Sequence, residues 1–111
     1  MVNQVQMQRF NKQVQDKTLL AVDLNVAMYL ASYIDITNGC IERRPTDICR
    51  DLGISDGRVY QSLKRLRAND WLVKGLKGAG YFFMLDPWTW TVGKKEVQPK
   101  RRGLFKKLQN D

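Results

Sequence analysis

The chain has 111 residues, 43% of them hydrophobic, which is enough for one domain with a modest core. Its 19 Lys and Arg outnumber 11 Asp and Glu, and the net charge of +8 attracts polyanions such as nucleic acid or an anionic membrane surface. The composition excludes a membrane helix, because no run approaches about 20 apolar residues. It also excludes the usual zinc ligand sets, because there is no histidine and the only cysteines are Cys40 and Cys49. We expect a bacterial cytoplasmic location, no metal or cofactor, and reduced cysteines.

The first 18 residues form a Gln-rich segment without a clear hydrophobic period. This segment can be a strand, a helix that completes a dimer, or a loose arm, and we treat residues 1–18 as an N-terminal arm or dimerisation segment. The next predicted element is a helix over about 23–35, capped at its N-terminus by Asp23. Its apolar residues recur at helical spacing: Leu24, Ala27, Met28, Leu30, Ala31 and Ile34. Residues 38–39 predict a turn, and residues 40–43 a short strand.

The central stretch, residues 45–67, carries the strongest pattern in the chain. A short helix begins at Pro45 and is ended by Gly53, which suits a left-handed residue after a helix. Ser55 then caps a second helix, and Cys49 supplies a small residue where the two helices should cross. The second helix has an apolar stripe of Val59, Leu63 and Leu66. These offsets favour a helix-turn-helix, and an ordinary helical hairpin is the alternative.

Two apolar stretches follow, residues 71–76 and 81–85, and the glycine-containing loop between them predicts a β-hairpin. A helix, a short strand, a helix-turn-helix and a hairpin in this order define a winged helix. We therefore predict an α+β fold, with about three core helices and a hairpin wing over residues 19–93, between N- and C-terminal extensions. Trp88 and Trp90 should pack back on the hairpin or on a partner chain. Residues 94–111 form a basic tail, either solvated or gripping phosphate, in which residues 104–108 could make a short amphipathic turn.

The face of the second helix opposite its apolar stripe carries polar and basic side chains and no acid after Asp56. Such a face fits the major groove of DNA, where Arg and Lys pair with guanine and Gln with adenine. A solvated helix face is the alternative for each cation taken singly. The predicted DNA-binding residues are Arg44, Thr46, Ser55, Gly57, Arg58, Tyr60, Gln61, Lys64, Arg65, Lys74 and Lys77.

These residues divide by expected role. Arg58, Gln61 and Arg65 should reach base edges, and Lys64 and Tyr60 should reach bases or phosphates. At the start of the preceding helix, Arg44 and Thr46 should grip the DNA backbone, aided by the helix dipole. Gly57 lets the helix lie close to the duplex. The wing contributes Lys74 and Lys77 to phosphate or the minor groove.

The stretch from about residue 28 to residue 93 resembles winged-helix proteins of the MarR-like broad class, and most of all the RepL-type plasmid replication proteins. The resemblance is carried by Pro-Thr-Asp-Ile-Cys-Arg-Asp-Leu-Gly-Ile-Ser at 45–55, and by Tyr-Phe-Phe-Met-Leu-Asp-Pro at 81–87 followed by Trp88, Trp90 and Gly93. That family closes its wing similarly, although Asn is commoner at the position of Asp86. The Gln-rich N-terminus and the basic tail also depart from the family. The resemblance implies binding at a replication origin or a plasmid promoter.

We therefore expect a non-catalytic protein that binds double-stranded DNA sequence-specifically, as a transcriptional regulator or a plasmid replication protein of a mobile element. A single module binds DNA non-specifically at only about 10⁻⁴ to 10⁻⁶ M. A homodimer is therefore expected, through the N-terminal segment or residues 88–92. The alternative is an assembly protein that acts on single strands or a protein partner through Trp88, Trp90 and the tail. An enzyme is disfavoured because the chain lacks histidine, a cysteine-based dyad and a phosphate-cradling loop. No small-molecule ligand is evident.

Overall fold

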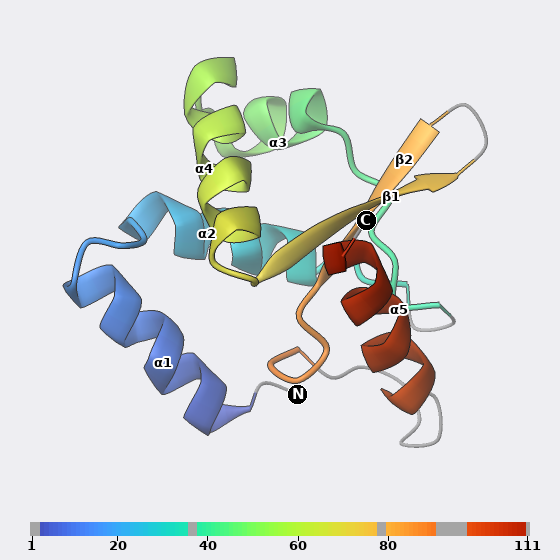
Figure 1. Cartoon of the computed structure of the whole chain (residues 1–111). Helices are drawn as coiled ribbons and strands as arrows, with labels where there is room; N and C mark the ends of the chain where they lie inside the picture. The colour runs from blue at the N-terminus through green and yellow to red at the C-terminus, as the bar shows by residue number, and fades with distance from the viewer. Residues whose placement is uncertain (1–2, 36–37, 78–79, 91–97, 111) are drawn as a thin grey trace.

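A computed structural model describes residues 3–35, 38–77, 80–90 and 98–110 of the chain. That part holds five helices and one two-stranded antiparallel sheet, which confirms the predicted α+β class (Figure 1). The elements in chain order are α1 (Gln4–Gln15), α2 (Ala21–Ala31), α3 (Pro45–Leu52), α4 (Asp56–Ala68), β1 (Leu72–Lys77), β2 (Gly80–Leu85) and α5 (Gln98–Asn110). Both α2 and α3 pack against α4, and β1 contacts α4 and α5. No helix in these ranges combines the length and apolar character needed to cross a membrane.

Of the alternatives for the N-terminal segment, the helix is the one observed. The Asn3 side chain caps α1 by accepting a hydrogen bond from the Gln6 N–H at 3.2 Å. Phe10 is fully buried, and its ring packs 4.9 Å from Trp71 and 6.1 Å from Trp90. Helix α1 therefore contributes to the main core, which also contains residues of α2, α4 and the hairpin.

The prediction for α2 was wrong in its bounds and partly wrong in its buried face. The helix begins at Ala21, and Asp23 is its third residue instead of its cap. The Asp23 carboxylate still serves the N-terminus, because it accepts a hydrogen bond from the Leu20 N–H at 2.8 Å. The buried face of α2 is made by Asp23, Val26, Ala27 and Leu30. Met28, expected in the core, is 52% exposed.

The segment from α3 to α4 follows the sequence prediction closely. Gly53 is left-handed, with φ of 67°, and its N–H donates to the Cys49 carbonyl at 2.9 Å. The Ser55 hydroxyl accepts from the Arg58 N–H at 3.4 Å, as an N-terminal cap does. The predicted stripe of α4 is buried: Val59, Leu63 and Leu66. The Cys49 thiol donates to Asp56 at 2.9 Å, and this hydrogen bond raises the pKa of the thiol.

The predicted hairpin is present, with pairing from Leu72 opposite Leu85 to Lys77 opposite Gly80. The predicted short strand over residues 40–43 is reduced to one bridge, in which Ile41 exchanges backbone hydrogen bonds with Phe83 at 2.8 and 3.0 Å. The bridge ties the segment before α3 to the hairpin.

The C-terminal tail is a helix over most of its length, not a solvated chain or a short turn. Phe105 of α5 is 1% exposed and forms a second apolar cluster with Val73 and Met84 of the hairpin. Trp88, Leu104 and Leu108 are half-buried against the same cluster. Helix α5 is therefore anchored to the hairpin through its apolar face.

Candidate nucleic-acid interface

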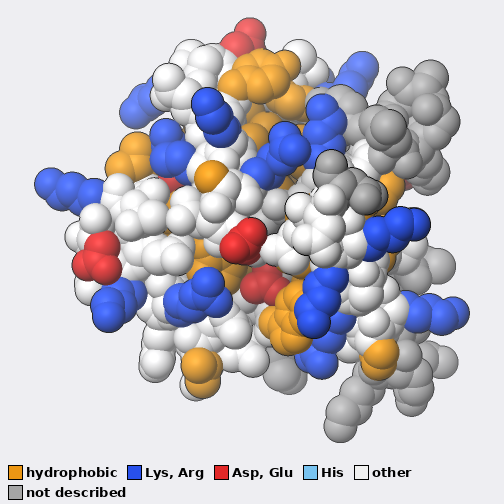
Figure 2. Space-filling model, in the orientation of Figure 1, with side chains coloured by type: hydrophobic (Ala, Val, Ile, Leu, Met, Phe, Trp, Pro, Cys, Tyr) orange, Lys and Arg blue, Asp and Glu red, His pale blue; other side chains and the backbone are white. Residues whose placement is uncertain are grey.

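One face of α4 points away from the core and carries five of the eleven predicted DNA-binding residues. Gly57, Arg58, Tyr60, Gln61 and Lys64 are all exposed, and Tyr60 is 60% exposed. The helix has a single acid, Asp56, in its first turn. Figure 2 shows Lys and Arg side chains gathered over α4 and beside it toward the hairpin. The outward face of α4 therefore carries cations and, after Asp56, no acid.

A groove of about 430 Å³ runs beside this face, between α4, the start of α3 and the hairpin. It is lined by Pro45, Tyr60, Leu63, Lys64, Arg67, Lys74 and Phe83. Three of these side chains are cations and none is an acid. An apolar floor with a rim of one charge sign focuses the electrostatic potential, so the groove favours an anionic ligand.

A second hollow of about 340 Å³ continues from the first toward α5 and shares Lys64, Arg67 and Lys74 with it. Leu108 and Gln109 form its α5 side. This hollow includes one acid, Asp70, which accepts a hydrogen bond from Gln109 at 3.2 Å. The positive charge is consequently concentrated on the α4 and β1 side.

Arg67 is not among the predicted DNA-binding residues, but it lines both hollows with Lys64 and Lys74. Its position could have been found from the hairpin, because β1 follows α4 directly and brings Lys74 back beside the end of the helix. The side chain of Lys77 lies outside the described residues.

Arg65 does not have the position expected of a base-reading residue. Its guanidinium donates to both carboxylate oxygens of Asp23, from Nε at 2.8 Å and from Nη2 at 2.9 Å. The Asp23 side chain is fully buried and the Arg65 side chain is 27% exposed. The hydrogen bonds to Asp23 raise the pKa of Arg65. We therefore correct the base-edge prediction: Arg65 holds α4 to α2.

The signal for this ion pair was present in the sequence. Asp23 is the only charged residue between Ala21 and Ala31, and a buried acid in an apolar helix needs a cationic partner. The partner lies 42 residues further along the chain, beyond the reach of helical spacing.

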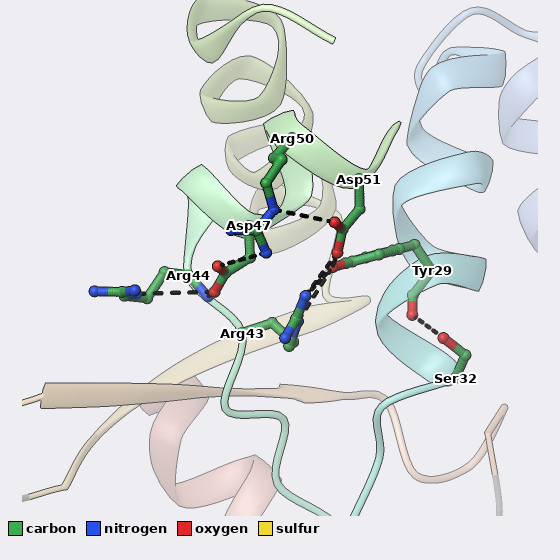
Figure 3. A network of polar contacts seen from close by, with 7 residues as sticks. All are labelled: Tyr29, Ser32, Arg43, Arg44, Asp47, Arg50 and Asp51. Atoms are coloured by element: carbon green, nitrogen blue, oxygen red, sulfur yellow. Dashed lines mark hydrogen bonds and ion pairs between the residues drawn. The ribbon is translucent and has the colours of Figure 1, made fainter. Parts of the chain in front are cut away.

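The start of α3 is exposed but partly neutralised. Arg44 and Thr46 are exposed, as expected for contacts to a DNA backbone. The Asp47 carboxylate accepts from the Arg44 N–H at 3.0 Å and forms ion pairs with the Arg44 and Arg50 side chains at 3.8 and 3.2 Å (Figure 3). The backbone hydrogen bond from Arg44, more than the nearby charges, lowers the pKa of Asp47. A phosphate at this terminus would share the Arg44 guanidinium with Asp47.

A second polar network in Figure 3 fixes α3 against α2. The Tyr29 hydroxyl donates to Asp51 at 2.5 Å, and Arg43 donates to Tyr29 and Asp51 at 2.9 and 2.6 Å. The Arg43 guanidinium also lies 4.3 Å from the centre of the Tyr33 ring. Burial, and then the hydrogen bond to Asp51, raises the pKa of Tyr29 to about 12. The Arg43 side chain therefore makes its contacts within the fold, although it is adjacent in sequence to Arg44, one of the predicted DNA-binding residues.

The two tryptophans after the hairpin have different surroundings. Trp90 is 6% exposed and packs edge-on against Trp71 at 6.4 Å, so its ring is not open to a base. Trp88 is half-buried against Phe105, with Arg102 and Lys106 each 5.6 Å from the centre of its ring. Of the two tryptophans assigned to single strands in the alternative function, Trp90 is therefore not accessible for base stacking.

Within the described residues, no three His, Cys, Asp or Glu side chains are grouped closely enough to hold a metal ion. Comparisons with protein-family models, curated proteins and solved structures found no match to this chain.

Proposed function

We propose that this protein binds double-stranded DNA through the outward face of α4, in the manner of a winged helix-turn-helix protein. The observation that carries the proposal is the acid-free groove beside that face, lined by Lys64, Arg67 and Lys74. The left-handed turn at Gly53 between α3 and α4, and the hairpin that follows α4, support the winged-helix interpretation.

In this proposal α4 enters the major groove with its N-terminal half toward the bases. Arg58 and Gln61 contact base edges, since Arg pairs with guanine and Gln with adenine. Lys64 and Arg67 contact phosphates along the groove wall, and Lys74 extends those contacts onto the wing. Gly57 is exposed and has nothing within 4 Å of the place a Cβ would occupy, so the backbone there leaves room for a duplex. At the start of α3, Arg44 and Thr46 contact the DNA backbone.

The role we infer is control of transcription or of plasmid replication by a non-catalytic, sequence-specific DNA-binding protein. The resemblance of residues 45–55 and 81–93 to RepL-type proteins supports this role and a bacterial, DNA-associated location. Selection of bound duplexes from a random pool, followed by footprinting beside the gene, would identify the target. Sites upstream of the gene would indicate autoregulation, and repeats within an origin would indicate initiation.

Fluorescence anisotropy with the selected duplex and a scrambled duplex tests the interface. Gln61→Ala should reduce the preference for the selected sequence, because it removes a base contact. Lys64→Ala should weaken binding to both duplexes and lower the salt dependence by about one unit of slope. The matched control is Lys12→Ala, which removes the same charge from the exposed surface of α1. If Lys64→Ala and Lys12→Ala weakened duplex binding equally, the binding would reflect only the net charge of the protein, and the proposed α4 interface would be refuted.

A further inference from the structure

Helix α5 presents a cationic surface that the proposed function does not use. Its 13 residues include five Lys and Arg and no Asp or Glu. Four of these five cations are exposed: Lys100, Arg102, Lys106 and Lys107. Among the described residues, no ion pair involves any of these four. Figure 2 shows Lys and Arg side chains over the α5 side of the molecule as well as over α4.

The fold holds the charge of α5 in a fixed position. Phe105 is 1% exposed and packs against the hairpin, so the opposite side of the helix is turned outward. Arg102 and Lys106 are one helical turn apart, and each lies 5.6 Å from the centre of the Trp88 ring. An aromatic ring attracts a cation without removing its charge. Arg102 and Lys106 are therefore two like charges held at one place on the surface, and we call them the Trp88 cation pair.

Two acids lie near Trp88, but both have other partners. Asp70 and Asp86 line a hollow of about 330 Å³ together with Trp88. The Asp86 carboxylate accepts hydrogen bonds from the Trp88 N–H at 2.8 Å and from the Thr89 hydroxyl at 2.6 Å. The Asp70 carboxylate accepts one from Gln109 at 3.2 Å. The Trp88 cation pair is thus left available to an anion from outside the chain.

The spacing of the α5 cations fits a linear polyanion better than a small anion. Lys100 and Lys107 are seven residues apart, which is about 10 Å along a helix that rises ~1.5 Å per residue. One strand of a DNA duplex places a phosphate about every 3.4 Å along the duplex axis. The cations of α5 therefore extend over the length of about three successive phosphates. Like charges four residues apart also destabilise a helix, and a bound polyanion removes their repulsion.

We propose that α5 is a second nucleic-acid contact, which holds the phosphate backbone of the duplex bound by α4; in this respect it rests on the proposed function. The hollow of about 340 Å³ joins the two surfaces, because Lys64 and Arg67 of α4 line one side of it and Leu108 and Gln109 of α5 line another. Figure 1 shows β1 between α4 and α5, and β1 contacts both helices. Contacts to phosphate carry no sequence information. Helix α5 should therefore add affinity and leave sequence preference to α4.

The packing of α5 disfavours the other polyanionic partners. A helix that binds an anionic membrane buries an apolar face among the lipid headgroups. In α5 this face is already covered, since Phe105 is buried and Leu104 and Leu108 are half-buried against the hairpin cluster. A single strand would need an open ring on which its bases could stack. The Trp88 ring is half-buried and already contacts Phe105 and the Trp88 cation pair.

Fluorescence anisotropy over a salt series tests this contact with the full chain and the selected and scrambled duplexes. Arg102→Gln with Lys106→Gln should weaken binding to both duplexes by the same factor. It should also lower the slope of log affinity against log salt by about 1.8, which is about 0.9 for each phosphate contact. The exchanged variant, Arg102→Lys with Lys106→Arg, keeps both charges and should keep the wild-type slope. Because both side chains are exposed, circular dichroism melts of these variants should match the wild type.

The matched control is Lys12→Gln with Lys17→Gln, which removes the same charge from exposed positions in and just after α1. This control should change the slope by less than about 0.9, the value for one phosphate contact. Equal changes in slope for the α5 variant and the α1 control would overturn the proposal. Tighter binding to a single strand, or to vesicles containing phosphatidylglycerol, than to either duplex would also overturn it.

The Lys64→Ala variant separates this inference from the proposed function. If Lys64→Ala weakens duplex binding and Arg102→Gln with Lys106→Gln does not, the α5 contact is refuted and the α4 interface stands. If only the α5 variant weakens duplex binding, the α4 interface is refuted and α5 remains a nucleic-acid contact.

Discussion

Replacing Arg65 with Ala tests whether this residue belongs to the fold or to the DNA interface. The substitution leaves the Asp23 carboxylate fully buried, with the Leu20 N–H still donating to it. Breaking a buried ion pair from one side costs about 3 to 5 kcal/mol. We take the lower end, because Arg65 is 27% exposed and Asp23 keeps a hydrogen bond. The expected loss in the free energy of unfolding is therefore about 3 kcal/mol.

This loss converts to a melting temperature through the entropy of unfolding. At about 2.1 cal/mol/K per residue, 111 residues give about 0.23 kcal/mol/K, so 3 kcal/mol corresponds to a decrease of about 13 °C. Circular dichroism melts and urea titrations measure it. The matched control is Lys64→Ala, one residue earlier on the same helix and exposed, for which the loss should stay within about 0.5 kcal/mol.

Duplex affinity should respond in the opposite order. Measured below its lowered melting temperature, Arg65→Ala should keep its affinity within about threefold, whereas Lys64→Ala should lose about eightfold at 0.1 M salt, the value for one phosphate contact. An Arg65→Ala variant that melts like the wild type but no longer binds DNA would refute the assignment of Arg65 to the fold.

Three further predictions concern the groove, the α2–α3 network and α5. The pair Lys64→Ala with Arg67→Ala should flatten the slope of log affinity against log salt by about 1.8, measured by anisotropy over a salt series. The hydrogen bond from Tyr29 lowers the pKa of Asp51 below its ordinary 3.8. The contribution of Asp51 to the free energy of unfolding is therefore fully present above pH 3.8 and is lost as the pH falls through the lowered pKa. Tyr29→Phe should therefore raise the pH of acid unfolding, followed by circular dichroism. Because the pKa of Tyr29 is raised from 10.0 to about 12 in the folded state, the wild-type protein should lose stability between pH 10 and about 12. The Tyr29→Phe variant should lose less stability over the same range. Phe105→Ala should cost about 3 kcal/mol and expose α5 to proteolysis, whereas Lys106→Ala should do neither.

The sequence was most informative where the determinants of structure are local. The left-handed turn at Gly53, the cap at Ser55 and the buried stripe of α4 depend on residues within a few positions of one another, and each is present as predicted. The hairpin was predictable for the same reason, since a glycine-containing loop joins its two apolar strands.

The terminal helices were harder to predict because their stability depends on distant contacts. Helix α1 is held by Phe10 against Trp71, and α5 by Phe105 against Val73. Neither segment has an apolar period strong enough to indicate its partner. The face of α2 was misassigned for a related reason. Asp23 was interpreted as a cap, which hid its role as a buried anion, and Met28 was placed in a core that it does not reach.

The arginines and lysines around α3 and α4 separate into two groups by their partners. Arg43, Arg44, Arg50 and Arg65 form ion pairs with Asp51, Asp47 and Asp23. Among the described residues no ion pair involves Lys64 or Arg67, which line both hollows beside α4. Cations held together without counter-ions repel one another, and an external polyanion relieves that repulsion. A duplex in the groove should therefore stabilise the wild-type fold by more than it stabilises the Lys64→Ala and Arg67→Ala pair, as thermal melts with and without DNA would measure.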